Sequence, residues 1–140
     1  MKTHTTNYNN TFIAIADDSL ATAGTVPPVK GDKQTVASLQ FEIIKKYPYK
    51  YTSDEVLFAV YAQRNDLTKD ELKAAREQFF SKGQPCFRAS PLGKSYGWGV
   101  HNDKEGKIAL YGCETKEYQQ FLNDGEMKVV KAMNTAKLKK

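Results

Sequence analysis

The sequence predicts an α+β fold in which a mainly antiparallel sheet is covered by two to four helices on one face. Three observations indicate this fold: apolar residues at helical spacing in the first half, a strong β-hairpin signal in the second half, and no repeat or linker between them. A chain of 140 residues can bury one hydrophobic core, so we expect a single domain over residues 1–140 with a basic tail from about residue 134.

The first elements should be a strand, a long loop and a helix. Residues 11–16 alternate apolar side chains and predict a strand. Pro27 and Pro28 favour an extended loop over residues 17–33. Apolar side chains then recur at helical spacing over residues 35–47, which predicts a helix that Pro48 ends.

Two capping-box patterns follow, each with a threonine three residues before a glutamate: Thr52 with Glu55, and Thr68 with Glu71. The apolar run 56–62 after the first pattern is short and dense, so it is consistent with either a helix or a strand. The second pattern predicts a helix over residues 69–82 that Gly83 ends.

The second half should hold a strand near residues 86–90, then a hairpin that pairs residues 96–101 with residues 107–112. A short helix over residues 115–122 comes next. Residues 127–133 fit a strand or a helix equally well.

The turn from Asp103 to Gly106 fixes the register of this hairpin. Aspartate at the first position and glycine at the fourth are typical of a type I turn followed by a left-handed residue, which places Val100 opposite Leu110. One face of the hairpin is then continuously apolar, with Tyr96, Trp98, Val100, Ile108 and Leu110.

The other face of the hairpin is glycine-rich and has two interpretations. Glycines in a strand indicate the close approach of another group. That group could be a packed helix, with Tyr111 covering Gly99 across the strands. It could instead be a ligand that contacts His101, Tyr111 and Arg88, the last arriving from the preceding strand.

Two further segments have both a binding and a structural interpretation. Lys30 and Lys33 stand just before a predicted helix, where free N–H groups favour anions, although Asp32 or Thr35 could simply cap that helix. The alternating tyrosines 47, 49 and 51 could stack on a planar ligand or anchor the loop between two helices.

Several chemistries lack their motifs. The GxxxxGK[ST] pattern of a phosphate-binding P-loop is missing. The HExxH metal motif is missing too, because His4 and His101 are the only histidines. Cys86 and Cys113 lack the paired short spacings of a zinc site, so we expect no metal and no cofactor. Cys113 and His101 would lie roughly 13 Å apart along the hairpin, too far for a proton relay, so inert thiols are expected.

Charge and cysteine content bear on partners and compartment. The net charge is +5, but most of the excess follows Gly125, where five lysines accompany one glutamate. A nearly neutral body is not typical of a dedicated nucleic-acid binder. No segment is long enough to span a membrane, and the first residues lack the apolar core of a signal peptide. With only two cysteines, we expect a cytoplasmic protein.

Six blocks carry a family resemblance: HTTNY (4–8), PPVKG (27–31), LQFE (39–42), PYKYTSDEVLF (48–58), FFSKGQPCFRASPL (79–92) and YGWGVH (96–101). On these blocks the chain resembles a family of short, single-domain bacterial proteins that are described only as a domain of unknown function. The resemblance covers nearly the whole chain. It implies one bacterial domain and brings no catalytic residues.

The preferred hypothesis is a small binding module for an anionic or planar ligand. Its contact residues would be Arg88, Tyr96, His101 and Tyr111, with Lys30 and Lys33 as outlying anion contacts.

Two other function classes stay open. The first is a small enzyme with His101 as general acid–base and Arg88 stabilising negative charge. The second is a domain that binds other proteins or forms homo-oligomers, which predicts an exposed apolar patch across Tyr96 and Trp98.

Overall fold

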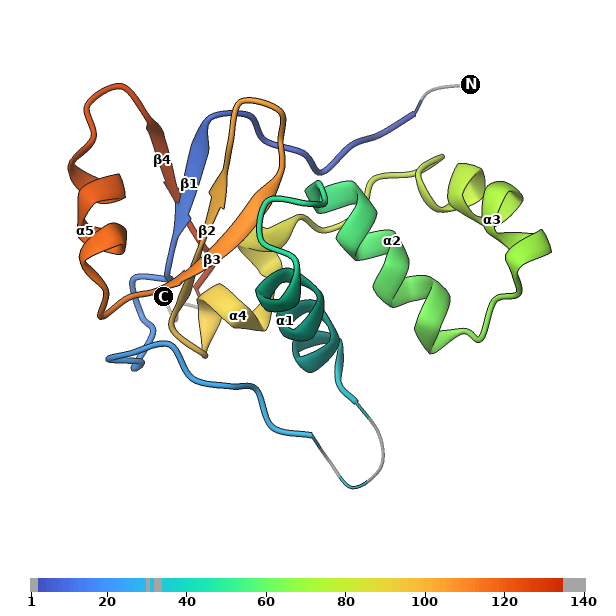
Figure 1. Ribbon diagram of the computed structural model, residues 1–140, viewed down its shortest axis with the longest axis horizontal. Coiled ribbons are helices and arrows are strands. Elements are labelled where there is room, and N and C mark those ends of the chain that lie inside the picture. Colours follow the sequence, from blue (N-terminus) through green and yellow to red (C-terminus); the bar gives the residue numbers. More distant parts are fainter. Residues whose placement is uncertain (1–2, 30, 32–33, 135–140) are drawn as a thin grey trace, which may run out of the picture.

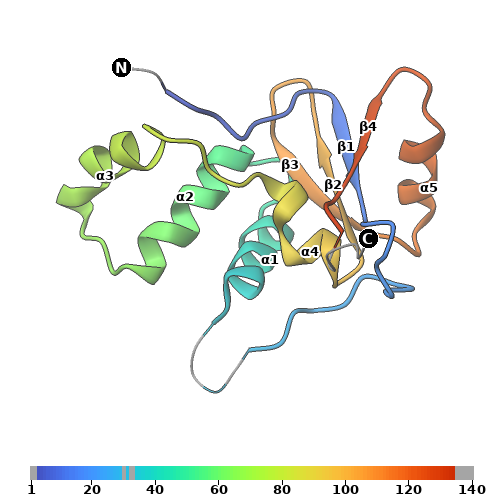
Figure 2. The ribbon, with the colours of Figure 1, turned by 180° about the vertical axis from the view of Figure 1, so that it is seen from behind.

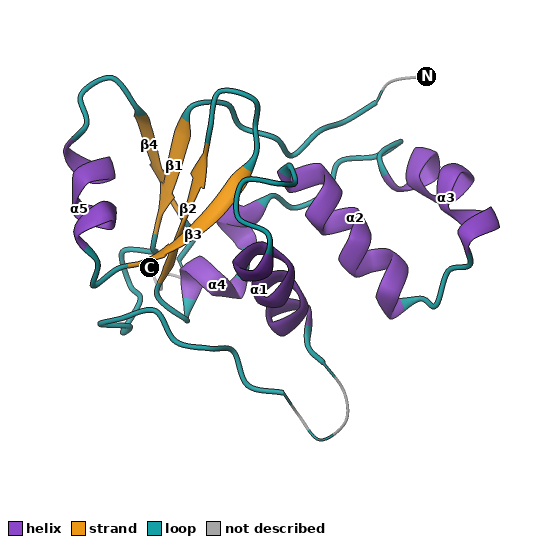
Figure 3. Ribbon diagram, in the orientation of Figure 1, coloured by secondary structure: helices purple, strands orange, loops and turns teal. Residues whose placement is uncertain are grey.

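The computed structural model describes residues 3–29, 31 and 34–134. Within these residues it is an α+β fold built on a four-stranded sheet with strand order β3-β2-β1-β4, which confirms the predicted fold class (Figures 1 and 3). With η denoting a 3₁₀ helix, the elements in chain order are β1 (Thr11–Ala14), α1 (Val36–Lys46), α2 (Ser53–Arg64), η1 (Lys69–Glu71), α3 (Leu72–Phe79), η2 (Phe87–Ala89), α4 (Pro91–Lys94), β2 (Trp98–Asn102), β3 (Ile108–Gly112), α5 (Lys116–Asn123) and β4 (Lys128–Lys131).

The hairpin has the register that its turn predicts. β2 pairs antiparallel with β3, and Val100 lies opposite Leu110. The Asp103 amide donates to the Lys107 carbonyl at 2.9 Å, and Gly106 takes the left-handed conformation with φ of 82°. On its other side β2 pairs antiparallel with β1, whereas β4 pairs parallel with β1. Residues 127–133, left open between helix and strand, therefore contain a strand.

Helices cover both faces of the sheet, which corrects the expectation of helices on one face. α1 and α4 lie against one face and α5 against the other (Figures 1 and 2). The reason is visible in β1, where Phe12 and Ile13 point to opposite faces and are 0% and 2% exposed. A central strand that is buried on both sides needs a layer on each.

The segment near residues 86–90 is not the predicted strand. Phe87–Ala89 forms the 3₁₀ helix η2, and α4 begins directly after it. Ser90 followed by Pro91 is a helix-start signal, because the Ser90 hydroxyl accepts the Leu92 N–H at 3.1 Å and proline suits the first helical position. This local signal overrides the apolar pattern that suggested a strand.

The capping boxes before α2 and η1 form as predicted, and residues 56–62 are helical. The helix predicted over residues 69–82 begins as η1 and continues as α3. It ends at Phe79 and not at residue 82. α2 and α3 extend away from the sheet as an arm, and α3 contributes no buried side chain (Figure 1). No helix in the described part of the chain is long and apolar enough to cross a bilayer.

The amino-terminal segment is tied to the start of α2. The buried carboxylate of Asp54 accepts hydrogen bonds from the Thr6 amide and hydroxyl, both at 2.7 Å, and from the Thr5 hydroxyl at 2.6 Å. In return the Asn7 side chain accepts the Asp54 amide at 2.8 Å. Two of the sequence blocks that carry the family resemblance therefore meet in one structural contact.

Candidate functional site

The glycine-rich face of the hairpin holds a cluster of three polar side chains. The hydroxyl of Tyr49, from the loop between α1 and α2, lies 2.8 Å from Nδ1 of His101 and 2.7 Å from the Tyr111 hydroxyl. The His101 ring stacks on Phe121 of α5, with ring centroids 4.3 Å apart. His101 and Tyr111 thus lie together, as the hairpin register predicts, and their polar atoms are engaged by Tyr49.

The electrostatics of this cluster favour neutral side chains. Burial lowers the pKa of His101 below its usual value, an effect that the nearby Asp103 carboxylate opposes. Burial raises the pKa of Tyr49 well above its usual value, and the hydrogen bond with Tyr111 adds to the rise. A neutral imidazole can accept the Tyr49 proton at Nδ1, which leaves the Tyr49 oxygen to accept from Tyr111.

The two glycines of this hairpin face allow close packing. Gly97 has φ of 80° and the backbone of Ala23 passes directly against it. A side chain at Gly99 would meet the rings of Phe12 and Tyr118. Tyr111 lies opposite Gly99 in register, but it is not the ring that covers this glycine, which corrects that part of the prediction.

Arg88 lies apart from His101. It belongs to η2, and its Nε donates to the carbonyl of Lys131 at the end of β4, at 2.7 Å. The Arg88 carbonyl in turn accepts the Met133 amide at 2.8 Å. The arginine therefore joins η2 to β4, and the structure does not bring it to the hairpin cluster.

The remaining predicted contacts are dispersed. Tyr96 is half-buried and packs against the main core, and its carbonyl accepts the Thr25 amide at 2.9 Å. Lys30 and Lys33 lie outside the described residues. The helix start that follows them is capped by its own chain, because the Thr35 hydroxyl accepts the Ser38 amide at 3.1 Å.

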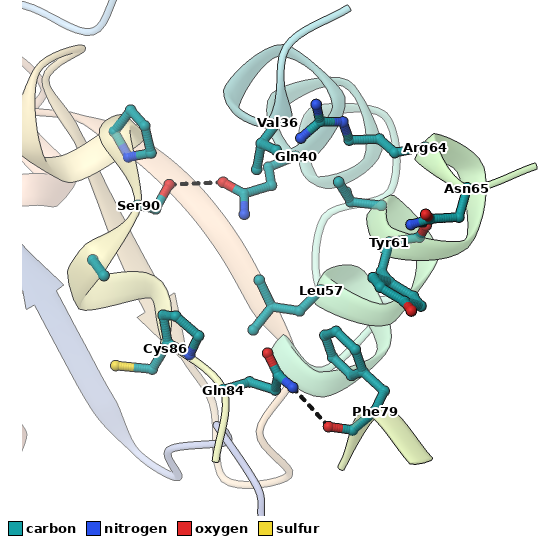
Figure 4. A pocket seen from close by; sticks show the side chains of 14 residues that line it. Val36, Gln40, Leu57, Tyr61, Arg64, Asn65, Phe79, Gln84, Cys86 and Ser90 are labelled. Atoms are coloured by element: carbon teal, nitrogen blue, oxygen red, sulfur yellow. Dashed lines mark hydrogen bonds between the residues drawn. The ribbon is translucent and has the colours of Figure 1, made fainter. Parts of the chain in front are cut away.

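A cavity of about 380 Å³ lies between α1, α2, the end of α3 and the segment 84–91 (Figure 4). Its lining is mostly apolar with a few polar groups, and comprises Val36, Gln40, Leu57, Val60, Tyr61, Arg64, Asn65, Phe79, Gln84, Pro85, Cys86, Ala89, Ser90 and Pro91. This volume and this composition are typical of a small-molecule site.

Gln40 is the polar group at the buried end of the cavity. Its side chain is 3% exposed, and Oε1 accepts the Ser90 hydroxyl at 2.7 Å. The Ser90 hydroxyl donates this hydrogen bond, and its oxygen also accepts the Leu92 N–H. With Oε1 of Gln40 bonded to Ser90, Nε2 points into the cavity (Figure 4).

No acceptor for Gln40 Nε2 is found among the described residues. In that part of the chain, every side-chain nitrogen or oxygen that is shielded from solvent has a hydrogen-bond partner. Because Gln40 Nε2 has no such partner, it is not shielded, and it is accessible through the cavity. A nearly buried donor with its hydrogen-bonding capacity free indicates a place for an acceptor from outside the chain.

An aromatic wall forms one side of the cavity. The rings of Tyr61 and Phe79 lie 4.7 Å apart between centroids and are inclined by 42°. Tyr61 is 40% exposed, so part of its ring is open to solvent. Leu57, one turn before Tyr61 on α2, adds aliphatic surface to the lining (Figure 4).

The cysteines lie outside the hairpin cluster, and Cys86 is part of the cavity lining. Both are half-buried free thiols. Cys86 approaches the Tyr8 hydroxyl at 3.8 Å, and its sulfur points away from Gln40 (Figure 4). Cys113 contacts the Ala21 carbonyl at 3.9 Å, and burial raises the pKa of its thiol. The described residues contain no group of three or more side chains suited to hold a metal ion.

Sequence reasoning missed the cavity because its walls come from segments far apart in the chain. One signal was present. Gln40 occupies the same helical row as Val36 and Ile44, four residues to either side, and a polar residue in an apolar row indicates a buried hydrogen bond or a site.

Comparisons with curated proteins and with solved structures find no match for this chain. Residues 3–138 match the family of unknown function DUF6157. Because this match spans nearly the whole sequence, the chain belongs to that family of unknown function.

Proposed function

We propose that this protein is a small-molecule binding module whose ligand enters the cavity between α1, α2 and the segment 84–91. The observation that carries the proposal is the Nε2 group of Gln40, which is nearly buried, lacks a partner among the described residues and points into an apolar hollow. A carbonyl or ring-nitrogen acceptor on the ligand would satisfy it.

The shape of the lining favours a flat ligand. Tyr61 and Phe79 supply aromatic rings to the lining, and Leu57 supplies aliphatic surface. Stacking on such rings gains contact area with little loss of side-chain freedom. Aromatic and heteroaromatic compounds of one or two rings match a volume of about 380 Å³.

This proposal keeps the binding function expected from the sequence and moves its centre. The hairpin cluster of Tyr49, His101 and Tyr111 uses its polar atoms internally, and Arg88 lies elsewhere. Trp98 is only 9% exposed, so it adds little to the exposed apolar patch that self-association at that face would need. We also propose that the module acts in the cytoplasm, supported by two cysteines that remain free thiols.

The test is a thermal-shift screen with a panel of indole, adenine, benzamide, benzoate and indole-3-acetate. A compound at a hundredfold over its Kd should add about 2.7 kcal/mol to the free energy of unfolding, which is several degrees in Tm. The variant Ala89→Phe places a ring in the cavity and should abolish the shift. Ala74→Phe, on the exposed surface of α3, adds the same ring elsewhere and should preserve it.

Two results would overturn the proposal. The first is the absence of any shift across the panel with the wild-type protein. The second is a shift that survives Ala89→Phe but is lost in Arg88→Ala or His101→Gln, which would return the site to the residues predicted from the sequence.

A further inference from the structure

We infer that the ligand of this cavity is a planar monocarboxylic acid, with its carboxylate at Arg64. This inference rests on the proposed function and specifies the ligand class. Arg64 is the one charged side chain among the described residues that line the cavity, and the lining holds no carboxylate. The cavity therefore has a single positive charge in largely apolar surroundings.

Arg64 is not engaged by its own chain. The described residues contain one ion pair, between Lys131 and Asp17, and no hydrogen bond from the guanidinium of Arg64 is found among them. An arginine in the last turn of a helix can bind the terminal carbonyls. Here Asn65 does so instead, because its backbone and side-chain N–H groups both reach the Tyr61 carbonyl.

The direction of Arg64 suits a role in the cavity. Its side chain extends from α2 towards α1, where Val36 and Gln40 line the hollow (Figure 4). Gln40 and Arg64 thus supply a neutral donor and a charged donor to the same cavity. The aromatic wall of Tyr61 and Phe79 forms part of the lining of this cavity.

The charge balance favours a carboxylate over a phosphate. A guanidinium matches a carboxylate with two parallel hydrogen bonds. A phosphate monoester carries up to two negative charges, and the lining offers one cation to pair with them. A monoanion is neutralised completely by Arg64.

The test compares matched acid and amide pairs by titration calorimetry: benzoate with benzamide, and indole-3-acetate with indole-3-acetamide. We expect each acid to bind at least tenfold more tightly than its amide. Arg64→Met should remove this preference while leaving amide affinity unchanged, and Arg64→Lys should keep part of it. Lys73→Met, which removes one positive charge from the exposed surface of α3, should leave both affinities unchanged.

The outcomes separate the inference from the proposed function. If acids and amides bind equally, and Ala89→Phe abolishes both, the proposed function stands and the carboxylate assignment is overturned. An acid preference that persists in Arg64→Met overturns it too, as does tighter binding of phenyl phosphate than of benzoate. If no member of either pair binds, both the inference and the proposed function fail. Arg64 is exposed, so an unchanged Tm of the free variant is expected.

Discussion

Tyr49 has a left-handed backbone with φ of 60°, a conformation that costs a residue with a bulky side chain free energy. Its contacts offset the strain, because its amide donates to the Ile108 carbonyl at 2.8 Å and its hydroxyl reaches both His101 and Tyr111. Of the two interpretations of the alternating tyrosines, the structure favours loop anchoring. The polar atoms of the hairpin cluster thereby serve the fold.

At the residue scale, the lowered pKa of His101 predicts how stability depends on pH. The groups that face this ring are Tyr49, Tyr111, Phe121 and the carboxylate of Asp103. The unfolded chain binds the proton more readily than the folded one, since the ordinary pKa of 6.5 lies above the folded value. The stabilisation is therefore complete above 6.5 and is lost as the pH falls through the folded pKa.

We expect the free energy of unfolding, measured by urea titration, to decrease as the pH falls below about 6.5. His101→Gln should flatten this dependence. An identical slope in wild type and His101→Gln would contradict the argument.

At the element scale, local signals predicted most of the fold. The turn at 103–106 gave the hairpin register, and the Thr52 capping box marked the start of α2, although the dense apolar run after it left helix and strand open. The prediction of a strand near residues 86–90 was wrong, because Ser90 and Pro91 start a helix. Helices on both faces and the cavity depend on contacts between distant segments, which periodicity does not encode.

The loop between β1 and α1 passes close to the start of β2, where Ala23 lies against Gly97, and this contact gives a prediction at the element scale. Gly97→Ala forces a side chain against the Ala23 backbone at a φ of 80°. We expect it to lower the free energy of unfolding by about 2 kcal/mol or more. Gly125→Ala is the matched control, since its new side chain would meet no atom within 4 Å, and it should change stability by less than about 0.5 kcal/mol. Equal effects of the two substitutions would exclude close packing as the reason for Gly97.

At the scale of the whole molecule, stability should be uneven. The sheet carries several of the largest fully buried side chains, among them Phe12 and Ile13, whereas α3 has none. Regions with few buried contacts open locally without global unfolding. The arm of α2 and α3 forms part of the cavity wall, so its opening would also open the cavity.

Native-state hydrogen exchange should resolve this difference. Amides of α3 are expected to exchange through openings of clearly lower free energy than amides of β2, which should exchange only on global unfolding. A cavity ligand should slow exchange in α3 more than in β2. Uniform protection across both elements would show that the arm and the sheet form one cooperative unit.

β3 is an edge strand of the sheet, and its edge bears on whether two copies of this chain can pair through their strands. Backbone groups exposed along a sheet edge are a template for strand pairing between chains. Here the loop that carries Tyr49 and Tyr51 already bonds both the amide and the carbonyl of Ile108. The chain thus occupies part of its own edge with an internal mimic of an incoming strand. At that position the backbone of Ile108 has no hydrogen-bonding group left for a second molecule, which opposes strand pairing between chains along the β3 edge.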